Sequence, residues 1–364
     1  MKVEGQVIDV TAGTLAPTPH SGHGQQHTPL VGEPASGPSA RRRPVDQLRQ
    51  RLFADDRRLT LHPGGCLNLG ASGVHVHYER FQFTTGVQEY TQVGRRVTVL
   101  YDAETAELAA IILGNIPLFD FDGDDAFATE TSITSGVGTR LLARVDVESA
   151  ALYGTGRQAR RHLKVLCTIR PRLRTVRVYS PNSEHVREFC RLMEPHIAPT
   201  QLVEAANPEE AARGADVIVT ATNSNVPVLF GEWLAPGTHV TSIVGSNKEL
   251  VPEGSVAHKR RELDDDVLAH ASAVVATHRD QAVQDEQGDL FDVVQRGLLS
   301  WDGIASLAEV VAGTAPRRSS EREITVFKQN GDQGATYLAL ARVCYERAKQ
   351  LGRGIEIDDS AAEQ

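Results

Sequence analysis

The stretch AALYGTGRQARRHLKVLCTIR, residues 150–170, constrains the fold more than any other part of the sequence. Its first residues are apolar and predict a strand, Gly154-Thr-Gly156 predicts a turn, and the remainder carries apolar side chains at helical spacing. An apolar strand that passes through a Gly-x-Gly turn into a helix is the start of a βαβ unit. The stretch therefore predicts a parallel sheet covered by helices.

The glycine turn also predicts a binding site for a dinucleotide. Gly154 starts the turn, Gly156 allows the backbone to approach a pyrophosphate, and Ala159 is small enough for the helix to pack closely on the strand. The free amides and the positive dipole at the start of the helix favour phosphate groups. The alternative is a tight turn in an α/β protein that binds no nucleotide, because the sixth position of G-x-G-x-x-G is Ala in this chain.

The end of the next predicted strand, RTVRVYS, bears on the 2′ position of the cofactor. NAD-binding proteins usually place an Asp or Glu there, which accepts from the ribose hydroxyls. In this chain the first acid, Glu184, falls inside the following predicted helix, whereas Ser180 and Asn182 could donate to a 2′-phosphate. The sequence therefore predicts NAD or NADP as the cofactor and favours NADP.

The first part of the chain predicts a polar tail and then a sheet. Residues 1–44 are rich in Gly, Pro, Ser, Thr and His, so we expect a disordered tail. The segment VDQLRQRLF predicts a short amphipathic helix, and four strand-like runs follow, namely LTLH, VHVHYERFQF, RRVTVLYD and LAAIIL. Because hardly a helix separates these runs, they predict a mainly antiparallel sheet.

The rest of the chain predicts a second domain. Strands alternate with helices over residues 144–334, which predicts a dinucleotide-binding domain with a parallel sheet. The last predicted helix, GATYLALARVCYERAKQLG, follows that sheet and is expected to return to the first domain. We therefore predict an α/β fold with a smaller α+β domain formed by residues 45–143 and 335–364.

Composition excludes some classes of protein. With 38 Lys and Arg against 47 Asp and Glu, the chain has a formal net charge of −9, which does not favour nucleic-acid binding. No apolar run is long enough to cross a bilayer and the N-terminus lacks a secretory signal, so we expect a cytoplasmic protein. The four cysteines lie far apart and the tail histidines lack acidic partners, so we expect no metal site.

Five motifs occur in a fixed order between residues 95 and 357. They are GTGRQARRHL, ADVIVTATNSNVPVLFGEWLAPGTHVTSIVGSN, RRELDDDVL, ITVFKQNG and ARVCYERAKQLGRG. Together these motifs resemble the ornithine cyclodeaminase and mu-crystallin family, of which the chain would be a divergent member. The resemblance implies that residues 144–334 form a Rossmann-like NAD(P)-binding domain. It also implies that the smaller domain binds substrate and forms a homodimer through its sheet.

The resemblance further implies an enzyme of amino-acid metabolism. The implied activity is that of an NAD(P)-dependent oxidoreductase, either an amino-acid dehydrogenase or an imine or ketimine reductase. Such an enzyme moves a hydride between nicotinamide and the α-carbon of an amino acid or of an imine derived from it. Two alternatives stay open: a deaminating lyase of the ornithine cyclodeaminase type that uses bound NAD, and an NADP-binding protein with little catalysis.

Position by position, the resemblance assigns more residues to the cofactor. These are Arg157 and Gln158 in the glycine turn, Thr222, Asn223 and Ser224 at the nicotinamide end, Val244 at the end of the next strand, and Thr131. The alternative for each is an ordinary residue of a loop or strand end.

The substrate side departs from the family pattern. Glu130 stands where the resemblance implies an Arg that clamps the substrate carboxylate, and like charges at contact distance repel. Glu130 is therefore expected to bind an amine or to transfer a proton, the alternative being a surface or cap residue. Asn247 aligns with the aspartate used in cyclodeamination, and the insertion KELVPEGSVAHK after it is either a lid or surface decoration.

The lysine that the resemblance implies in the early strands is also absent. The segment VHVHYERFQF offers Arg80 as a cation and His77 as a candidate general acid. His75, His77 and Glu79 alternate along the predicted strand and therefore share one face, which is either part of the site or solvated. Lys328, in FKQNG, matches a lysine that the resemblance places near the domain junction.

Overall fold

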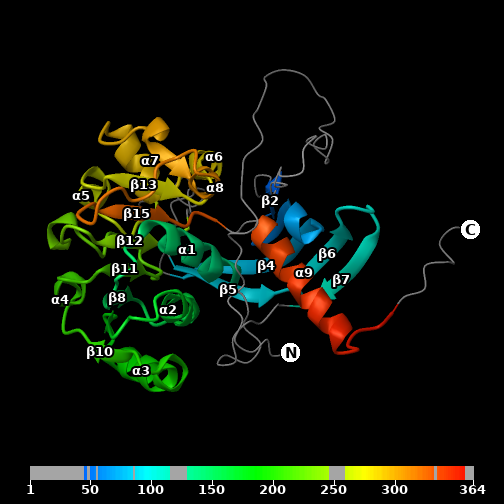
Figure 1. The fold of residues 1–364 in the computed structure, drawn as a ribbon, viewed down its shortest axis with the longest axis horizontal. Helices are drawn as coiled ribbons and strands as arrows, with labels where there is room; N and C mark the ends of the chain where they lie inside the picture. Colours follow the sequence, from blue (N-terminus) through cyan, green and yellow to red (C-terminus); the bar gives the residue numbers. More distant parts are fainter. Residues whose placement is uncertain are drawn as a thin grey trace, which may run out of the picture.

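The computed structural model of the protein describes residues 45–46, 50–54, 56–84, 87–114, 129–245, 259–331 and 334–356. These residues form a parallel sheet and an antiparallel sheet, which Figure 1 shows on either side of helix α1 (Thr129–Leu142). The predicted α/β fold with a second, antiparallel domain is confirmed. The predicted disordered tail, residues 1–44, lies outside the described residues.

The parallel sheet has the strand order β10-β9-β8-β11-β12-β15-β13-β14, and each neighbouring pair is parallel. Its strands are β8 (Ser149–Tyr153), β9 (Thr175–Tyr179), β10 (Gln201–Glu204), β11 (Val217–Thr220), β12 (His239–Ser242), β13 (Ala273–Ala276), β14 (Ile304–Ser306) and β15 (Thr325–Lys328). Every residue of β11, β12 and β15 is buried. These strands are buried over their whole length because helices cover both faces of the sheet.

Alternate residues of β8 define the two faces. Ala150 and Leu152 pack in the core cluster that contains α2 (Arg157–Ile169) and α3 (Ser183–Ile197). Ala151 and Tyr153 pack in the opposite cluster. That cluster includes side chains of α4 (Pro208–Ala212), α5 (Asp265–Ala269), α6 (Arg279–Gln284) and α7 (Gly288–Gln295). Helices α1 and α8 (Leu307–Ala312) share a further cluster with Phe327 of β15. The sheet is therefore the middle of three layers.

The second sheet is antiparallel in every pairing that the structure describes. Its strands are β1 (Val45–Asp46), β2 (Gln50–Ala54), β3 (Arg57–Cys66), β4 (Ala71–Thr84), β5 (Val87–Val93), β6 (Val97–Asp102) and β7 (Leu108–Leu113). Helix α9 (Gly334–Gln350) returns to this sheet, where Leu338 and Ala341 pack with Ala71 and Leu100 (Figure 1). The expected return of the last helix is therefore observed.

The helix expected over the segment VDQLRQRLF is wrong. Residues 45–46 and 50–54 are instead strands β1 and β2, and both pair with β3. A short segment has little helix stability of its own, and pairing with the long strand β3 satisfies its backbone hydrogen bonds instead. Strand β5 was not predicted; it pairs with β4.

The packing of helix α1 affects where the boundary between the two domains is placed. The expected boundary at residue 143 assigns α1 to the antiparallel unit, whereas α1 packs mainly against α2, β12 and β15 and also contacts α9. We propose that α1 belongs to the parallel unit and that the rest of the expected division stands.

No helix among the described residues is long and apolar enough to cross a membrane.

Candidate functional site

The glycine turn after β8 passes between the ends of two neighbouring strands. Gly154 has φ 103°, and a Cβ there would lie 2.3 Å from the carbonyl oxygen of Ala221, which follows β11. Its amide donates to the carbonyl of Tyr179 at the end of β9 (2.8 Å). Only glycine tolerates both this backbone conformation and this close approach, so the first glycine of the motif is fixed by the fold.

The second glycine opens toward free space. Gly156 is the exposed N-cap residue of α2, no side chain caps the helix there, and a Cβ would meet no atom within 4 Å. In the same turn, Oε1 of Gln158 is buried without a hydrogen-bond partner among the described residues. An uncapped helix start leaves backbone N–H groups for an anionic ligand. The turn therefore fits the diphosphate of a dinucleotide.

Sheet topology brings most of the predicted cofactor residues to one edge. Strand β8 lies between β9 and β11, so the chain order reverses beside it, and ligands of open α/β sheets bind at the carboxyl ends of strands at such a point. Ser180 and Asn182 follow β9, residues 222–224 follow β11, and Val244 follows β12. The structure thus places them on both sides of the glycine turn.

The side chains beyond β9 have partly defined roles. Asn182 is the N-cap of α3, and its Oδ1 accepts from the amides of Glu184 (2.9 Å) and His185 (3.3 Å). Its Nδ2 remains a donor at the exposed surface. Ser180 is half-buried, and Arg157 is exposed at the first turn of α2.

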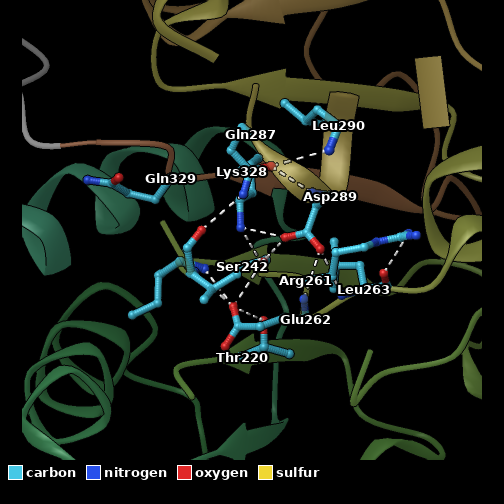
Figure 2. Close-up of polar contacts among 12 residues, drawn as sticks. Thr220, Ser242, Arg261, Glu262, Leu263, Gln287, Asp289, Leu290, Lys328 and Gln329 are labelled. Atoms are coloured by element: carbon cyan, nitrogen blue, oxygen red, sulfur yellow. Dashed lines mark hydrogen bonds and ion pairs between the residues drawn. The ribbon is translucent and has the colours of Figure 1, made fainter. Parts of the chain in front are cut away.

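Glu262 is fully buried and joins the ends of β11 and β12 (Figure 2). Its carboxylate accepts from the amides of Thr222 (2.7 Å) and Val244 (3.0 Å). Hydroxyl groups also donate to it, from Thr220 (3.0 Å), Thr222 (2.8 Å) and Ser242 (2.9 Å). Two predicted cofactor residues, Thr222 and Val244, are therefore held by one carboxylate.

An ion pair lies directly beside Glu262. Lys328, the last residue of β15, donates to Asp289 Oδ2 (2.6 Å) and to Ser242 Oγ (2.8 Å). Asp289 Oδ1 accepts from the amides of Glu262 (2.9 Å) and Leu263 (3.1 Å). Lys328, expected near the domain junction, is thus buried under the carboxyl edge of the sheet. We call Thr220, Thr222, Ser242, Glu262, Asp289 and Lys328 the Glu262 cluster.

Helix α1 carries Glu130 and Thr131 at its buried start. Their exposed fractions are 3% and 6%, and Thr131 Oγ1 donates to Glu130 Oε1 (2.8 Å). Oγ1 of neighbouring Thr129 is buried without a hydrogen-bond partner among the described residues. The alternative of a surface residue is therefore wrong for Glu130.

Two hydrogen bonds tie α1 to both units of the protein. Thr134 Oγ1 lies 3.0 Å from Thr336 Oγ1 of α9, and Ser135 Oγ lies 2.9 Å from His162 Nε2 of α2. Burial lowers the pKa of His162 to about 4, although the carbonyl of Gln158 opposes this shift by accepting from the ring. His162 is therefore neutral at pH 7, and it braces the helix that bears the glycine turn.

Three imidazoles and a phenol share the buried face of β3 and β4. His75 stacks on Tyr337 of α9 with ring centroids 3.9 Å apart, and His62 packs 5.1 Å from both His77 and Tyr337. His75 and His77 have exposed fractions of 3% and 4%. The alternative of a solvated strand face is therefore wrong. We call these four side chains the imidazole face.

His77 lies between a cation and a carboxylate. Its Nδ1 accepts from Arg96 Nη1 (2.9 Å), because a guanidinium can only donate. The proton of the neutral ring then sits on Nε2, 3.9 Å from Glu79 Oε2. Glu79 is also bound by Arg58 through Nε (3.1 Å) and Nη2. The imidazole face thus borders two cations, buried Arg96 and half-buried Arg58.

Arg80 lies on the other face of β4 from His77. It is exposed, and its Nε donates to Asp56 (2.9 Å). The structure therefore places these two candidates on opposite faces of β4, as their alternation along the strand implies. Asn247 and most of the insertion after it lie outside the described residues.

Several site residues were missed from the sequence. Glu262 and Asp289 are acids whose partners come from distant strands, and Gln287 donates to the carbonyl of Val244 (3.0 Å) from the start of α7. The one sequence signal for Glu262 was its place in RRELDDDVL directly before an apolar residue, Leu263. Leu263 is buried in the structure. Among the described residues, no group of His, Cys, Asp and Glu could hold a metal ion.

Comparison with known proteins accords with this geometry. The model of the ornithine cyclodeaminase/mu-crystallin family matches residues 68–352. The chain belongs to this family.

Family members of known name are similar over most of the chain. A Delta(1)-pyrroline-2-carboxylate reductase of Bacillus cereus is 29% identical over 87% of the chain and 90% of its own length. The mouse ketimine reductase mu-crystallin is 28% identical over 68% of each chain. The structure of the Thermococcus litoralis Delta(1)-pyrroline-2-carboxylate reductase with NADH and L-proline has a TM-score of 0.70. It is 25% identical and covers 86% of this chain and 90% of its own. The predicted resemblance is confirmed.

Proposed function

We propose that the protein is an NAD(P)-dependent oxidoreductase that acts at the α-carbon of an amino acid or of an imine derived from it. The observation that carries the proposal is the uncapped Gly-x-Gly turn, open at Gly156, at the point where the sheet order reverses. The names of its relatives agree, since they include pyrroline-2-carboxylate and ketimine reductases. Of the activities that the sequence left open, imine reduction is the one we favour.

The carboxyl edge of the sheet offers groups for each part of the cofactor. The turn with Gly154, Gly156, Arg157 and Gln158 would hold the diphosphate, and Ser180 and Asn182 would hold the adenosine ribose. Residues 222–224, Val244 and Thr131 would hold the nicotinamide. When bound, this group supplies or accepts a hydride at the substrate carbon.

The substrate side is built from Glu130 and the imidazole face. A buried carboxylate at Glu130 favours an amine or iminium group over a carboxylate. The guanidiniums of buried Arg96 and half-buried Arg58 favour an acidic group near β3 and β4. His77 was the expected general acid, but Arg96 occupies its Nδ1, so in our proposal its neutral ring donates a hydrogen bond to the substrate from Nε2.

The choice between NAD and NADP remains part of the proposal. The chain has no acid at the end of β9, which favours NADP, whereas relatives have been solved with NADH or NAD bound. Titration of the protein with NADH and with NADPH, followed by the fluorescence of the bound cofactor, compares the two dissociation constants directly.

Substrate tests distinguish the three activities. Oxidation of NADH or NADPH with Delta(1)-pyrroline-2-carboxylate, other cyclic imines, or pyruvate plus amines supports the reductase. Proline formed from ornithine without net change in NADH supports a cyclodeaminase instead. Tight cofactor binding without turnover on this whole panel supports a binding protein with little catalysis, and absence of binding removes all three.

We further propose that the protein is a homodimer formed through the antiparallel sheet. Paired residues of β4, β6 and β7 place one apolar set on the face opposite α9: Val74, Val76, Tyr78, Val97, Val99, Tyr101, Leu108, Ile111 and Leu113. Leu108, Ile111 and Leu113 are 53%, 52% and 60% exposed. A continuous exposed apolar patch of this kind is typical of a protein interface. We call it the apolar sheet face.

A cytoplasmic location also remains a proposal. The four cysteines are free, and burial raises the pKa of the Cys66 thiol and raises that of Cys190 to about 11. Buried, unreactive thiols suit a reducing compartment. Retention in the cytosolic fraction of the source cells would support this.

A further inference from the structure

Glu262 accepts hydrogen bonds on both carboxylate oxygens from the backbone of two different loops. Oε1 accepts from the amide of Thr222, and Oε2 accepts from the amides of Ile243 (3.1 Å) and Val244. We propose that Glu262 is a positioning residue that holds the two nicotinamide-side loops in register, a task that requires a carboxylate. The inference rests on the function proposed above, because that function places the nicotinamide at these loops.

The requirement for a carboxylate follows from the direction of the hydrogen bonds. Backbone N–H groups only donate, so the side chain at 262 must accept at both of its ends. A glutamine accepts at one end and donates at the other. In either orientation its NH₂ group faces a backbone N–H, of Thr222 or of Val244, and one of the two loops must shift.

The position of Glu262 is itself fixed from two sides. Its amide donates to Asp289, which the ammonium of Lys328 also binds. Ser242 accepts from Lys328 and has one hydroxyl proton, which it gives to Glu262 (2.9 Å) or to Asp289 (3.1 Å). Asp289 of α7 therefore fixes the backbone of Glu262, and Ser242 of β12, which Lys328 of β15 binds, contacts its carboxylate (Figure 2).

Buried hydrogen bonds hold both loops from beneath, and Arg260 Nη2 also donates to the carbonyl of Asn223 at the surface (2.9 Å). The amide of Val244 donates to Glu262 and its carbonyl accepts from Gln287, while Oγ1 of Thr222 accepts from the amide of Ser224 (3.1 Å). With the diphosphate at β8, the strands β11 and β12 lie away from β9 and its ribose-binding residues. Glu262 therefore acts on the nicotinamide half of the site and leaves the adenosine half unaffected.

The test compares two ligands in wild type and Glu262→Gln. NADH spans both halves of the site, whereas ADP-ribose lacks the nicotinamide. If wild type prefers NADPH, the test uses NADPH and 2′-phospho-ADP-ribose instead. Glu262→Gln loses one hydrogen bond to a charged group, so its affinity for NADH should be about tenfold lower than that of wild type. Its affinity for ADP-ribose should be unchanged. Equal losses for both ligands, or no loss for either, would overturn the proposal.

A matched control lies two residues away. Asp264 accepts from the amides of Gly231 and Val267 through a single oxygen, Oδ1 (both 3.0 Å). Asp264→Asn therefore keeps both bonds while it removes a charge, and both affinities should match wild type. If Asp264→Asn loses as much NADH affinity as Glu262→Gln, the effect comes from the lost charge alone, which would overturn the proposal.

A measurement on the wild-type protein covers the case in which Glu262→Gln does not fold. Hydrogen exchange of the ligand-free protein should show the amides of Thr222 and Val244 protected like strand amides, although both lie beyond strand ends. Rapid exchange of either amide would overturn the proposal. The exchange rates do not depend on cofactor binding. They therefore distinguish two failures: if the Glu262 role is wrong, the amides exchange rapidly, and if the proposed function is wrong, wild type binds neither NADH nor ADP-ribose.

Discussion

Lys328 and Asp289 form an ion pair of 2.6 Å in which neither side chain is exposed. The pair connects the end of β15 to the start of α7, and through the amide of Glu262 it reaches the ends of β11 and β12. A buried pair of this kind holds geometry more than it adds stability, since desolvation offsets much of the attraction.

Removing one member of this pair should be more damaging than replacing both. Lys328→Met leaves Asp289 buried without its cation, and we expect the free energy of unfolding to fall by about 3–5 kcal/mol. In the double variant with Asp289→Asn, the new Oδ1 still accepts from the amides of Glu262 and Leu263. Urea unfolding should show the double variant to be more stable than Lys328→Met, and additive losses would contradict this.

The two glycines of the turn should respond in opposite ways. Gly156→Trp places an indole in the open volume beside the start of α2, so dinucleotide binding should be abolished while the protein stays folded. Calorimetric titration with NADH and NADPH measures this. Unchanged affinity would remove the turn from the binding site.

Gly154→Ala is the matched comparison. Its Cβ would lie 2.3 Å from a carbonyl oxygen at φ 103°, so we expect a loss of about 2 kcal/mol or more in the free energy of unfolding. A denaturant midpoint equal to that of wild type would show that the turn relaxes easily.

Glu130 should affect chemistry but not cofactor affinity. Glu130→Gln removes the buried charge while it keeps an acceptor for Thr131, so turnover or its pH profile should change with the NADH affinity preserved. Glu232→Gln, at an exposed site, is the control. Wild-type kinetics across pH in Glu130→Gln would reduce this residue to a structural role.

Stability should fall in acid because burial lowers the pKa of His162 and of His239. Burial lowers the pKa of His162 to about 4 and of His239 to about 3, from 6.5 in the unfolded chain. Between pH 6.5 and those values the unfolded chain binds more protons, so the free energy of unfolding falls as pH drops. Each ring contributes at most about 1.4 kcal/mol per pH unit.

The variant His162→Gln should flatten this dependence. Its urea midpoints between pH 7 and 5 should decline less steeply than those of wild type, because only His239 then contributes of the two. Identical slopes would show that His162 is not the titrating group.

The apolar sheet face should control oligomeric state. Ile111→Asp places a charge in the middle of β7, within this face, and should convert a dimer into a monomer, which light scattering after size-exclusion chromatography detects. Val145→Asp, at a site 85% exposed outside this face, should leave the mass unchanged. A dimer in Ile111→Asp would place the interface elsewhere.

Local sequence patterns were enough to predict the parallel sheet and its glycine turn. The apolar runs of β8 and β11, and the helical spacing within α2, are periodicities of contiguous residues, and Gly154 has a local backbone requirement. The segment with helical spacing after the glycine turn forms α2.

Only the tertiary structure decided which side chains meet. His62, His75 and Tyr337 form one face, and Glu262, Asp289 and Lys328 form one cluster, although long stretches of chain separate them. Pairing with β3 likewise overrode the helical pattern of residues 45–53. The physical reason is that a local period fixes the shape and buried side of a single element. The partner of a buried charge is set by strand order and register, which depend on the packing of the whole chain.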